Sequence, residues 1–257
     1  MGVIKMNPVK VRIVDIGVGM PKICVPIVGC TRDEILKTAK DILNSSADVV
    51  EWRVDWFEGA FDIEAVKSVL AELRTTLGEM PILFTFRTKA EGGEKEISYE
   101  QYSKLVKEVA STSIADLIDV EVFIDDSVEE LVAELQKHDV KVVGSNHDFS
   151  KTPDKEEIVR RLCYMQEVGV DIPKIAVMPQ NKKDVLALLS ATEEMASEHA
   201  DRPIVTMSMA GLGAVSRVAG EIFGSAVTFG ALQKASAPGQ VQVEELKKML
   251  EIMHIEP

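Results

Sequence analysis

The stretch KICVPIVGCTRDEILKTAKDILNSSADVVEWRV, residues 22–54, contains the alternation on which the fold prediction depends. Its first and last seven residues are rich in β-branched and other apolar side chains, a composition typical of buried strands. Between them, Thr31 and Glu34 have the spacing of a capping box at the start of a segment with helical periodicity. We therefore predict a strand, a helix and a second strand in this stretch.

The same alternation repeats without a break to the end of the chain. It predicts strands over residues 22–28, 48–54, 81–87, 116–122, 140–146, 173–178, 203–209 and 226–230. Eight β-then-α units in 257 residues indicate a single (β/α)8 barrel domain over 1–257, with an open doubly wound sheet as the alternative. Residues 10–20 are expected to form a short β-hairpin that turns at Ile16 and Gly17 and lies across the bottom of the barrel.

The composition is that of a globular protein with ample material for a core, 46% hydrophobic and 28% charged. The net charge of −13 argues against a nucleic-acid partner and against an anionic membrane surface. The N-terminal residues lack a signal-peptide pattern and no apolar run reaches membrane-spanning length, so we expect a cytoplasmic protein. The three cysteines form no Cys-x-x-Cys pair and are expected to be buried, reduced thiols.

Polar side chains recur late in the predicted strands, where a barrel places its active site. They are Glu51, Arg53 and Asp55, then Thr85 and Arg87, then Asp119 and Glu121, and finally His147. Each of them alone could be part of a structural ion pair, because barrel interiors commonly hold such pairs. Their convergence at one mouth indicates a polar pocket.

Lys174 lies within the apolar run DIPKIAVMP (171–179), on the predicted strand that follows the one ending near His147. A lysine among apolar side chains loses hydration of its ammonium form, which favours a neutral amine that can attack a carbonyl carbon. The resulting imine acidifies the adjacent C–H, and a histidine on the next strand can take that proton. Alternatively, the amine reaches the bottom of the barrel, and the residues alone do not decide between these positions.

Several segments resemble the type I 3-dehydroquinate dehydratases, the Schiff-base dehydroquinases of the shikimate pathway. They are EWRVD (51–55), FTFRT (84–88) followed by EGG (91–93), SNHDF (145–149), PKIAVMPQ (173–180), TMSMAGLGAVSRV (206–218) and FGALQKASAPGQ (229–240). The resemblance implies a (β/α)8 barrel that dehydrates 3-dehydroquinate to 3-dehydroshikimate. It also implies a homodimer that needs no metal or organic cofactor.

The resemblance further implies a role for individual residues. Lys174 forms the imine, His147 is the acid–base group, and Glu91 orients the histidine. Arg217 takes the substrate carboxylate, for which a planar guanidinium has the matching geometry. Three residues bind the ring hydroxyls: Glu51, Arg53 and Arg87. Ser236 and Gln240 belong to a lid over residues 231–242. Lys234, on the same lid, is expected to be a solvated charge. Ala210 departs from the family pattern, which has glycine there, and is expected to touch no reacting group.

Other functions remain open at this stage. A class I aldolase or transaldolase also uses a barrel lysine, but it breaks a C–C bond. A metal-dependent hydrolase would use the acids and the histidine at the mouth, although the sequence contains no HxH or HExxH spacing. A catalytically silent ligand-binding barrel is the third alternative.

Overall fold

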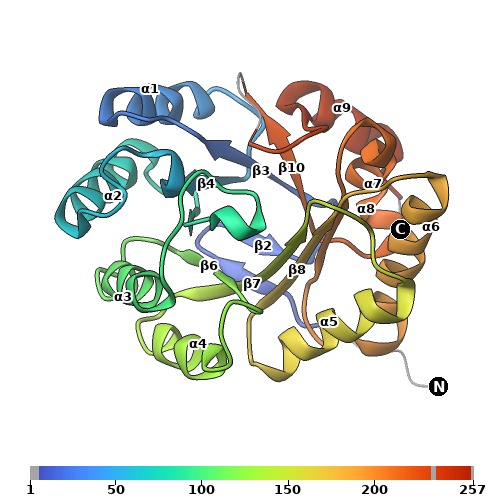
Figure 1. Ribbon diagram of the computed structural model, residues 1–257. Helices are drawn as coiled ribbons and strands as arrows, with labels where there is room; N and C mark the ends of the chain where they lie inside the picture. Colours follow the sequence, from blue (N-terminus) through green and yellow to red (C-terminus); the bar gives the residue numbers. More distant parts are fainter. Residues whose placement is uncertain (1–5, 233–235, 256–257) are drawn as a thin grey trace.

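The computed structural model describes residues 6–232 and 236–255, and these residues form the predicted barrel (Figure 1). The ring consists of parallel strands that agree with the predicted ones to within a few residues. They are β3 (Lys22–Ile27), β4 (Val49–Arg53), β5 (Ile82–Thr85), β6 (Leu117–Glu121), β7 (Lys141–Asp148), β8 (Ile172–Val177), β9 (Val205–Ser208) and β10 (Val227–Ala231). A short strand, β11 (Val241–Gln242), pairs with the end of β10.

The ring closes between β9 and β10. Neighbouring strands elsewhere share longer parallel ladders, whereas these two are joined by a bridge between Ile204 and Ser225. The amide of Ala226 donates to the carbonyl oxygen of Ile204 at 2.8 Å and completes the closure. A closed ring excludes the open doubly wound sheet.

Helices surround the ring and cover its outer face. They are α1 (Arg32–Ile42), α2 (Ile63–Leu77), α3 (Tyr99–Ala110), α4 (Val128–Gln136), α5 (Lys155–Glu167), α6 (Lys182–Glu194), α7 (Ala214–Val218), α8 (Gly220–Phe223) and α9 (Val243–Met253). Shorter helical turns are η1 (Val54–Trp56), η2 (Lys89–Glu91), η3 (Met195–His199) and η4 (Gly211–Gly213). The capping box predicted at Thr31 and Glu34 is confirmed, and it fixes the start of α1. None of the helices in the described residues is long and apolar enough to cross a membrane.

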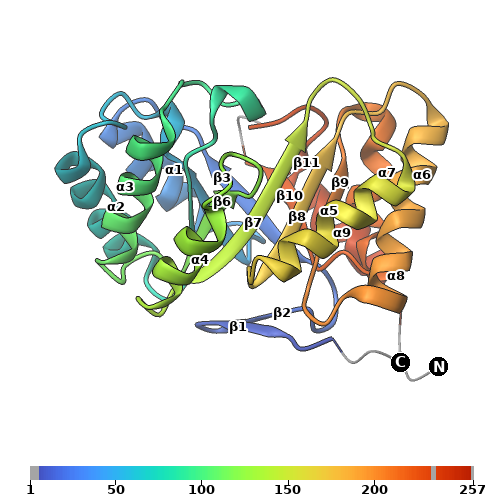
Figure 2. The ribbon, with the colours of Figure 1, turned by 60° about the horizontal axis from the view of Figure 1, so that its bottom comes forward.

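The predicted hairpin lies across the bottom of the barrel as β1 (Val9–Val11) and β2 (Val14–Ile16) (Figure 2). The predicted turn at Ile16 and Gly17 is wrong, because the chain turns at Arg12 and Ile13. Arg12 adopts a left-handed φ of +52°, and its guanidinium pairs with Asp116, just before β6. The Ile16 side chain is instead buried, 1% exposed, in the apolar cluster at the lower end of the barrel.

The barrel interior changes from apolar to polar along the strands. Val49, Leu83, Leu117, Val143 and Ile172 belong to the inner apolar cluster. Two residues later on the same strands, and so on the same face, lie the buried polar residues Glu51, Thr85, Asp119, Ser145 and Lys174. The lower half of the barrel is therefore a core, and the upper half is available for chemistry.

The prediction of buried thiols is correct for Cys24 and wrong for Cys30. Cys24 lies within β3, on the inner face of the ring, whereas Cys30 is exposed in the loop that leads to α1. Cys163 is partly buried, and all three thiols are free.

Candidate active site

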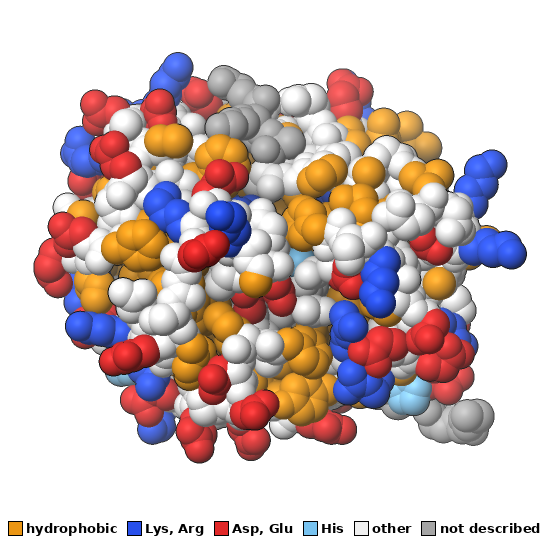
Figure 3. All heavy atoms as spheres, viewed as in Figure 1, with side chains coloured by type: hydrophobic (Ala, Val, Ile, Leu, Met, Phe, Trp, Pro, Cys, Tyr) orange, Lys and Arg blue, Asp and Glu red, His pale blue; other side chains and the backbone are white. Residues whose placement is uncertain are grey.

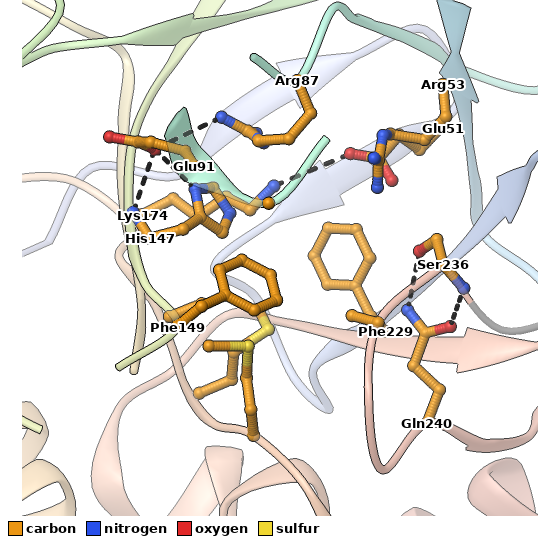
Figure 4. Close-up of a pocket in the computed structure, with 15 residues that line it drawn as sticks. Glu51, Arg53, Arg87, Glu91, His147, Phe149, Lys174, Phe229, Ser236 and Gln240 are labelled. Atoms are coloured by element: carbon orange, nitrogen blue, oxygen red, sulfur yellow. Dashed lines mark hydrogen bonds and ion pairs between the residues drawn. The ribbon is translucent and has the colours of Figure 1, made fainter. Parts of the chain in front are cut away.

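A pocket opens at the top of the ring, where the carboxyl ends of the strands meet the following loops (Figure 4). All the residues to which the resemblance gives a catalytic or substrate-binding role, except Arg217, line it. The lining consists of Glu51, Arg53, Arg87, Glu91, Gly92, His147, Phe149, Lys174, Ala176, Met207, Met209, Phe229, Ser236, Ala237 and Gln240. The polar lining residues come from β4, β7 and β8 and from the segments after β5 and β10. Four other polar residues predicted at the mouth are buried but do not line the pocket: Asp55, Thr85, Asp119 and Glu121.

The amine of Lys174 lies inside the upper half of the barrel and not at its bottom. Its Nζ is 3.2 Å from Asp119 Oδ2, 3.7 Å from Glu51 Oε1 and 4.6 Å from the centre of the Phe229 ring. Besides the apolar side chains of its own run, the amine faces two carboxylates. Their charges offset the cost of burying it.

Asp119 is the carboxylate nearest to the lysine, and its other oxygen is also occupied. Its Oδ1 accepts hydrogen bonds from Arg87 Nη2 at 2.7 Å and from Ser145 Oγ at 2.6 Å. Burial alone would raise the pKa of Asp119, but the charges of Arg87 and Lys174 and the Ser145 hydroxyl lower it overall. An ionised aspartate therefore stands beside the amine. The alternation of polar residues placed Asp119 at the mouth, but nothing in the sequence assigned it to Lys174.

His147 and Glu91 form a hydrogen-bonded pair at the pocket wall, drawn with dashed lines in Figure 4. Nδ1 of His147 is 2.9 Å from Glu91 Oε2, and the same oxygen accepts the His147 amide at 3.0 Å. Burial, with the charges of Arg87 and Lys174, lowers the pKa of His147 well below 6.5. Burial and then the charge of Glu121 raise the pKa of Glu91 to about 8.

These two shifts make the pair a single titrating unit. When it holds a proton, that proton lies between Glu91 Oε2 and Nδ1 of His147, which are 2.9 Å apart. When the proton leaves, the Nδ1–H group donates to the Glu91 carboxylate, and Nε2 becomes a free base. Glu91 therefore determines which nitrogen of His147 can accept a proton.

Arg53 and Arg87 bring positive charge to the pocket, and both are held by acids. Arg53 donates from Nε and Nη2 to the two oxygens of Asp55, each at 2.8 Å. Asp55 also accepts from the Arg87 and Glu94 amides, at 3.3 and 3.1 Å. Through these hydrogen bonds, the buried Asp55 joins the segment that carries Glu91 to Arg53 at the end of β4.

Arg217, on α7, lies beside the pocket and not among its lining residues. Its Nη2 donates to the Pro238 carbonyl oxygen at 3.0 Å and its Nη1 to that of Phe229 at 3.4 Å. Its Nε has no hydrogen-bond partner in the described part of the chain. Burial lowers the pKa of Arg217 to about 10, and no acid contributes to that shift. A buried guanidinium in these surroundings is suited to an anion.

Ser236 and Gln240 face the pocket from the segment that follows β10. The Ser236 amide donates to Gln240 Oε1 at 2.9 Å, and Gln240 Nε2 donates to Ser236 Oγ at 3.1 Å. Residues 233–235 of the predicted lid, including Lys234, lie outside the described residues. Ala210 has a left-handed φ of +56°, and its amide donates to the Pro238 oxygen at 3.1 Å. That it touches no reacting group stays a prediction.

The pocket also has apolar walls. Met207 and Met209 line it, although a methionine late in a strand more commonly fills the core. Phe149 and Phe229 line it as well, and no pattern in the sequence singled them out. Among residues 6–232 and 236–255, no group of three or more His, Cys, Asp and Glu side chains is arranged to hold a metal ion.

Known proteins resemble the chain over nearly its whole length. Residues 23–257 match the family described as Type I 3-dehydroquinase. A 3-dehydroquinate dehydratase from Clostridioides difficile (strain 630) is 56% identical over 96% of this chain and 97% of its own. The one from Syntrophotalea carbinolica is 55% identical over 98% of this chain and 100% of its own.

Solved structures agree. The Clostridium difficile type I 3-dehydroquinate dehydratase with covalent modified comenic acid has a TM-score of 0.94 at 55% identity, over 96% of this chain and 98% of that one. The 3-dehydroquinate dehydratase from Geobacillus kaustophilus HTA426 also has a TM-score of 0.94, at 37% identity, over 98% of both chains. The barrel, its pocket and these matches together establish that the chain belongs to the type I 3-dehydroquinase family.

Proposed function

We propose that the chain dehydrates 3-dehydroquinate to 3-dehydroshikimate through an imine on Lys174. The observation that carries the proposal is the buried Lys174 amine, which shares one pocket with His147. The names of the similar proteins support the reaction. The covalent comenic acid in the Clostridium difficile structure supports covalent chemistry with an organic acid in this family.

The first step forms the imine. The Lys174 nitrogen attacks the ring ketone, and the ketone oxygen leaves as water once the carbinolamine has been protonated. A lysine that starts as an ammonium has to lose a proton before it can attack. Asp119 Oδ2, at 3.2 Å, and Glu51 Oε1, at 3.7 Å, are the carboxylate oxygens beside the amine. The positive charge that returns with the protonated imine lies next to the same two acids.

The second step is the elimination. The protonated imine withdraws electrons from the neighbouring carbon, and Nε2 of His147 removes a proton from it. The resulting enamine expels the β-hydroxyl group, which takes the proton from His147 and leaves as water. Hydrolysis of the conjugated imine then releases the enone acid and restores the Lys174 amine. One molecule of water is lost overall.

Binding of the substrate carboxylate is proposed for Arg217. An acidic protein with a net charge of −13 repels anions in general, so it needs local positive charge to hold one. The Arg217 guanidinium is buried without an acidic partner contributing to its pKa, unlike Arg53 and Arg87. Ring hydroxyls would then face Glu51, Arg53 and Arg87, and Ser236 and Gln240 would cover the ligand.

Product formation tests this proposal. Purified protein supplied with 3-dehydroquinate is expected to generate the ultraviolet absorbance of a conjugated enone, and Lys174→Met protein is expected to generate none. Cleavage of a C–C bond in place of this product would favour the aldolase alternative. Absence of any turnover by folded protein would favour the silent binding barrel.

We also propose that the chain is one catalytic domain that acts as a homodimer in the cytoplasm. Exposed apolar side chains on α7, α8 and α9 support an interface with a second copy: Val215, Ile222, Met249 and Ile252. Figure 3 shows hydrophobic side chains in its upper right part, where Figure 1 places α7 and α9. The three free thiols are compatible with a reducing compartment.

A further inference from the structure

Asn146, next to His147 on β7, joins Glu91 to an arginine outside the pocket. Its Nδ2 donates to Glu91 Oε1 at 3.0 Å, and its Oδ1 accepts from Arg161 Nη1 at 2.9 Å. Arg161 belongs to α5, so this chain of hydrogen bonds runs from a surrounding helix to the Glu91 and His147 pair. Asn146 itself is 8% exposed.

The two neighbours of Asn146 allow only one orientation of its amide group. A guanidinium only donates hydrogen bonds, so the side of Asn146 that faces Arg161 has to be the oxygen. The nitrogen then faces Glu91, where a carboxylate oxygen accepts. The opposite orientation would place two donors against each other at Arg161 and two acceptors against each other at Glu91.

Arg161 is itself held in place. Its Nε donates to Glu157 Oε1 at 2.7 Å, one turn earlier on α5. Its guanidinium carbon lies 5.9 Å from the centre of the Phe123 ring. With Asn146 as the third contact, the guanidinium has little freedom to turn, and the Asn146 orientation follows from it.

This arrangement gives both oxygens of Glu91 fixed donors. Oε1 accepts from Asn146, while Oε2 accepts from the His147 amide and faces the His147 ring. Hydrogen bonds to a carboxylate favour its ionised form. The Asn146 donor lowers the pKa of Glu91 and thus opposes the effect of burial.

We propose that Asn146, oriented by Arg161, is a positioning residue that keeps Glu91 a hydrogen-bond acceptor, so that His147 carries its proton on Nδ1 and presents Nε2 to the substrate. The catalytic use of Nε2 rests on the proposed dehydration. The choice of His147 tautomer does not, and it can be measured without substrate.

Other charged groups also face the Glu91 and His147 pair. They are Glu51, Arg53, Arg87, Asp119, Glu121 and Lys174. All of them stay in place in the variants below, so a difference between variants reports on Asn146 and Arg161.

The experiment follows the ring nitrogens of His147 by NMR of ¹⁵N-histidine protein between pH 6 and 10, with His147→Gln identifying the signals. In the natural protein Nε2 is expected to lose its proton as the pH rises through the midpoint of the pair, while Nδ1, which faces Glu91, carries a proton above it. Asn146→Ala is expected to raise that midpoint by about one pH unit, because the carboxylate loses a donor. Arg161→Met is expected to raise it by less, since the amide remains but can turn.

Two further variants separate orientation from charge. Arg160→Met is the matched control, because Arg160 also donates to Glu157, at 2.6 and 2.8 Å, but does not reach Asn146. Its midpoint should equal that of the natural protein. In the Asn146→Ala and Arg161→Met double variant, the shift should equal that of Asn146→Ala alone, because Arg161 acts through Asn146. A larger shift would mean that Arg161 acts by its charge and would overturn its positioning role.

An unchanged midpoint in both Asn146→Ala and Arg161→Met would overturn the inference as a whole. If Asn146→Ala does not fold, the comparison of Arg161→Met with Arg160→Met decides, and equal midpoints would contradict it. The pH profile of kcat/KM for dehydration should shift in parallel with the NMR midpoints. Shifted midpoints in a protein without dehydratase activity would contradict the proposed function and leave the tautomer assignment intact.

Discussion

The Nζ of Lys174 lies 3.2 Å from Oδ2 of Asp119, inside a barrel where the two side chains are 4% and 0% exposed. A nucleophilic lysine is usually pictured as a bare amine in an apolar site, whereas Lys174, the proposed nucleophile, has a counter-ion. The counter-ion is useful after the attack as well as before it, because a protonated imine carries its positive charge on the same nitrogen. In the proposed reaction, Asp119 would therefore stabilise the protonated imine as well as the resting ammonium.

Asp119→Asn should destabilise the protein and slow it. Lys174 and Arg87 would both lose a buried partner, and breaking such a pair by removing one member costs about 3–5 kcal/mol. Urea denaturation measures the free energy of unfolding, and we expect kcat to fall at least tenfold. Asp33→Asn is the control, since the Asp33 side chain is 92% exposed and its loss should change stability by less than about 0.5 kcal/mol. Equal stabilities of the two variants would contradict a structural charge at Asp119.

Activity should depend on the titration of the Glu91 and His147 pair. The pair is a base only after its proton has left, and the pKa of Glu91 is raised to about 8. We therefore expect kcat/KM to fall about tenfold per pH unit as the pH drops below about 8, and to level off above it. Initial rates between pH 6 and 10 measure this, with protein stability checked at each pH. A profile that stays flat between pH 6 and 8 would mean that the proton is held elsewhere.

Arg217→Lys should weaken substrate binding more than it slows the chemistry. The variant keeps the positive charge and loses the planar pair of donors that matches a carboxylate. We expect KM to rise at least tenfold with a smaller change in kcat, and Arg160→Lys, on an exposed face of α5, to leave both constants unchanged. A KM like that of the natural protein would move the carboxylate site away from Arg217.

The proposed interface predicts a change of mass in solution. Light scattering should give twice the chain mass of 28.2 kDa for the natural protein and the single chain mass for Ile222→Glu. Ile222 is 47% exposed within the apolar face of α7 to α9. Ile13→Glu, at a residue 72% exposed on the hairpin, should stay a dimer. If Ile222→Glu also keeps the doubled mass, the dimer uses another face.

Local sequence patterns predicted the strands well, because each strand needs only its own alternation of side chains. Glu51 could be placed at the mouth for the same reason, whereas the position of the Lys174 amine followed only from the family resemblance. The hairpin turn was missed because Arg12 takes its left-handed conformation beside Asp116, more than a hundred residues away. The hydrogen bond from Arg161 to Asn146 could not be predicted either, since it depends on how α5 packs against β7.

The side-chain environments were harder to predict than the positions. The apolar run around Lys174 suggested a dry amine, yet the carboxylates that face it come from β4 and β6. In the sequence, Arg217 carries the same charge as Arg53 and Arg87 and cannot be told apart from them. In the structure, its guanidinium is buried and no acid contributes to its pKa. The contact of Ala210 with Pro238 could not be predicted either, because it joins two segments that are separate in sequence.

Borohydride reduction of the protein during turnover is the decisive measurement. In the presence of 3-dehydroquinate, reduction should trap a stable secondary amine, and peptide mass spectrometry should locate it on Lys174 and on no other lysine. Without the substrate, the same treatment should leave the protein mass unchanged. An active, folded protein that gives no adduct, or a Lys174→Met protein that still dehydrates 3-dehydroquinate at the natural rate, would rule out the imine on Lys174.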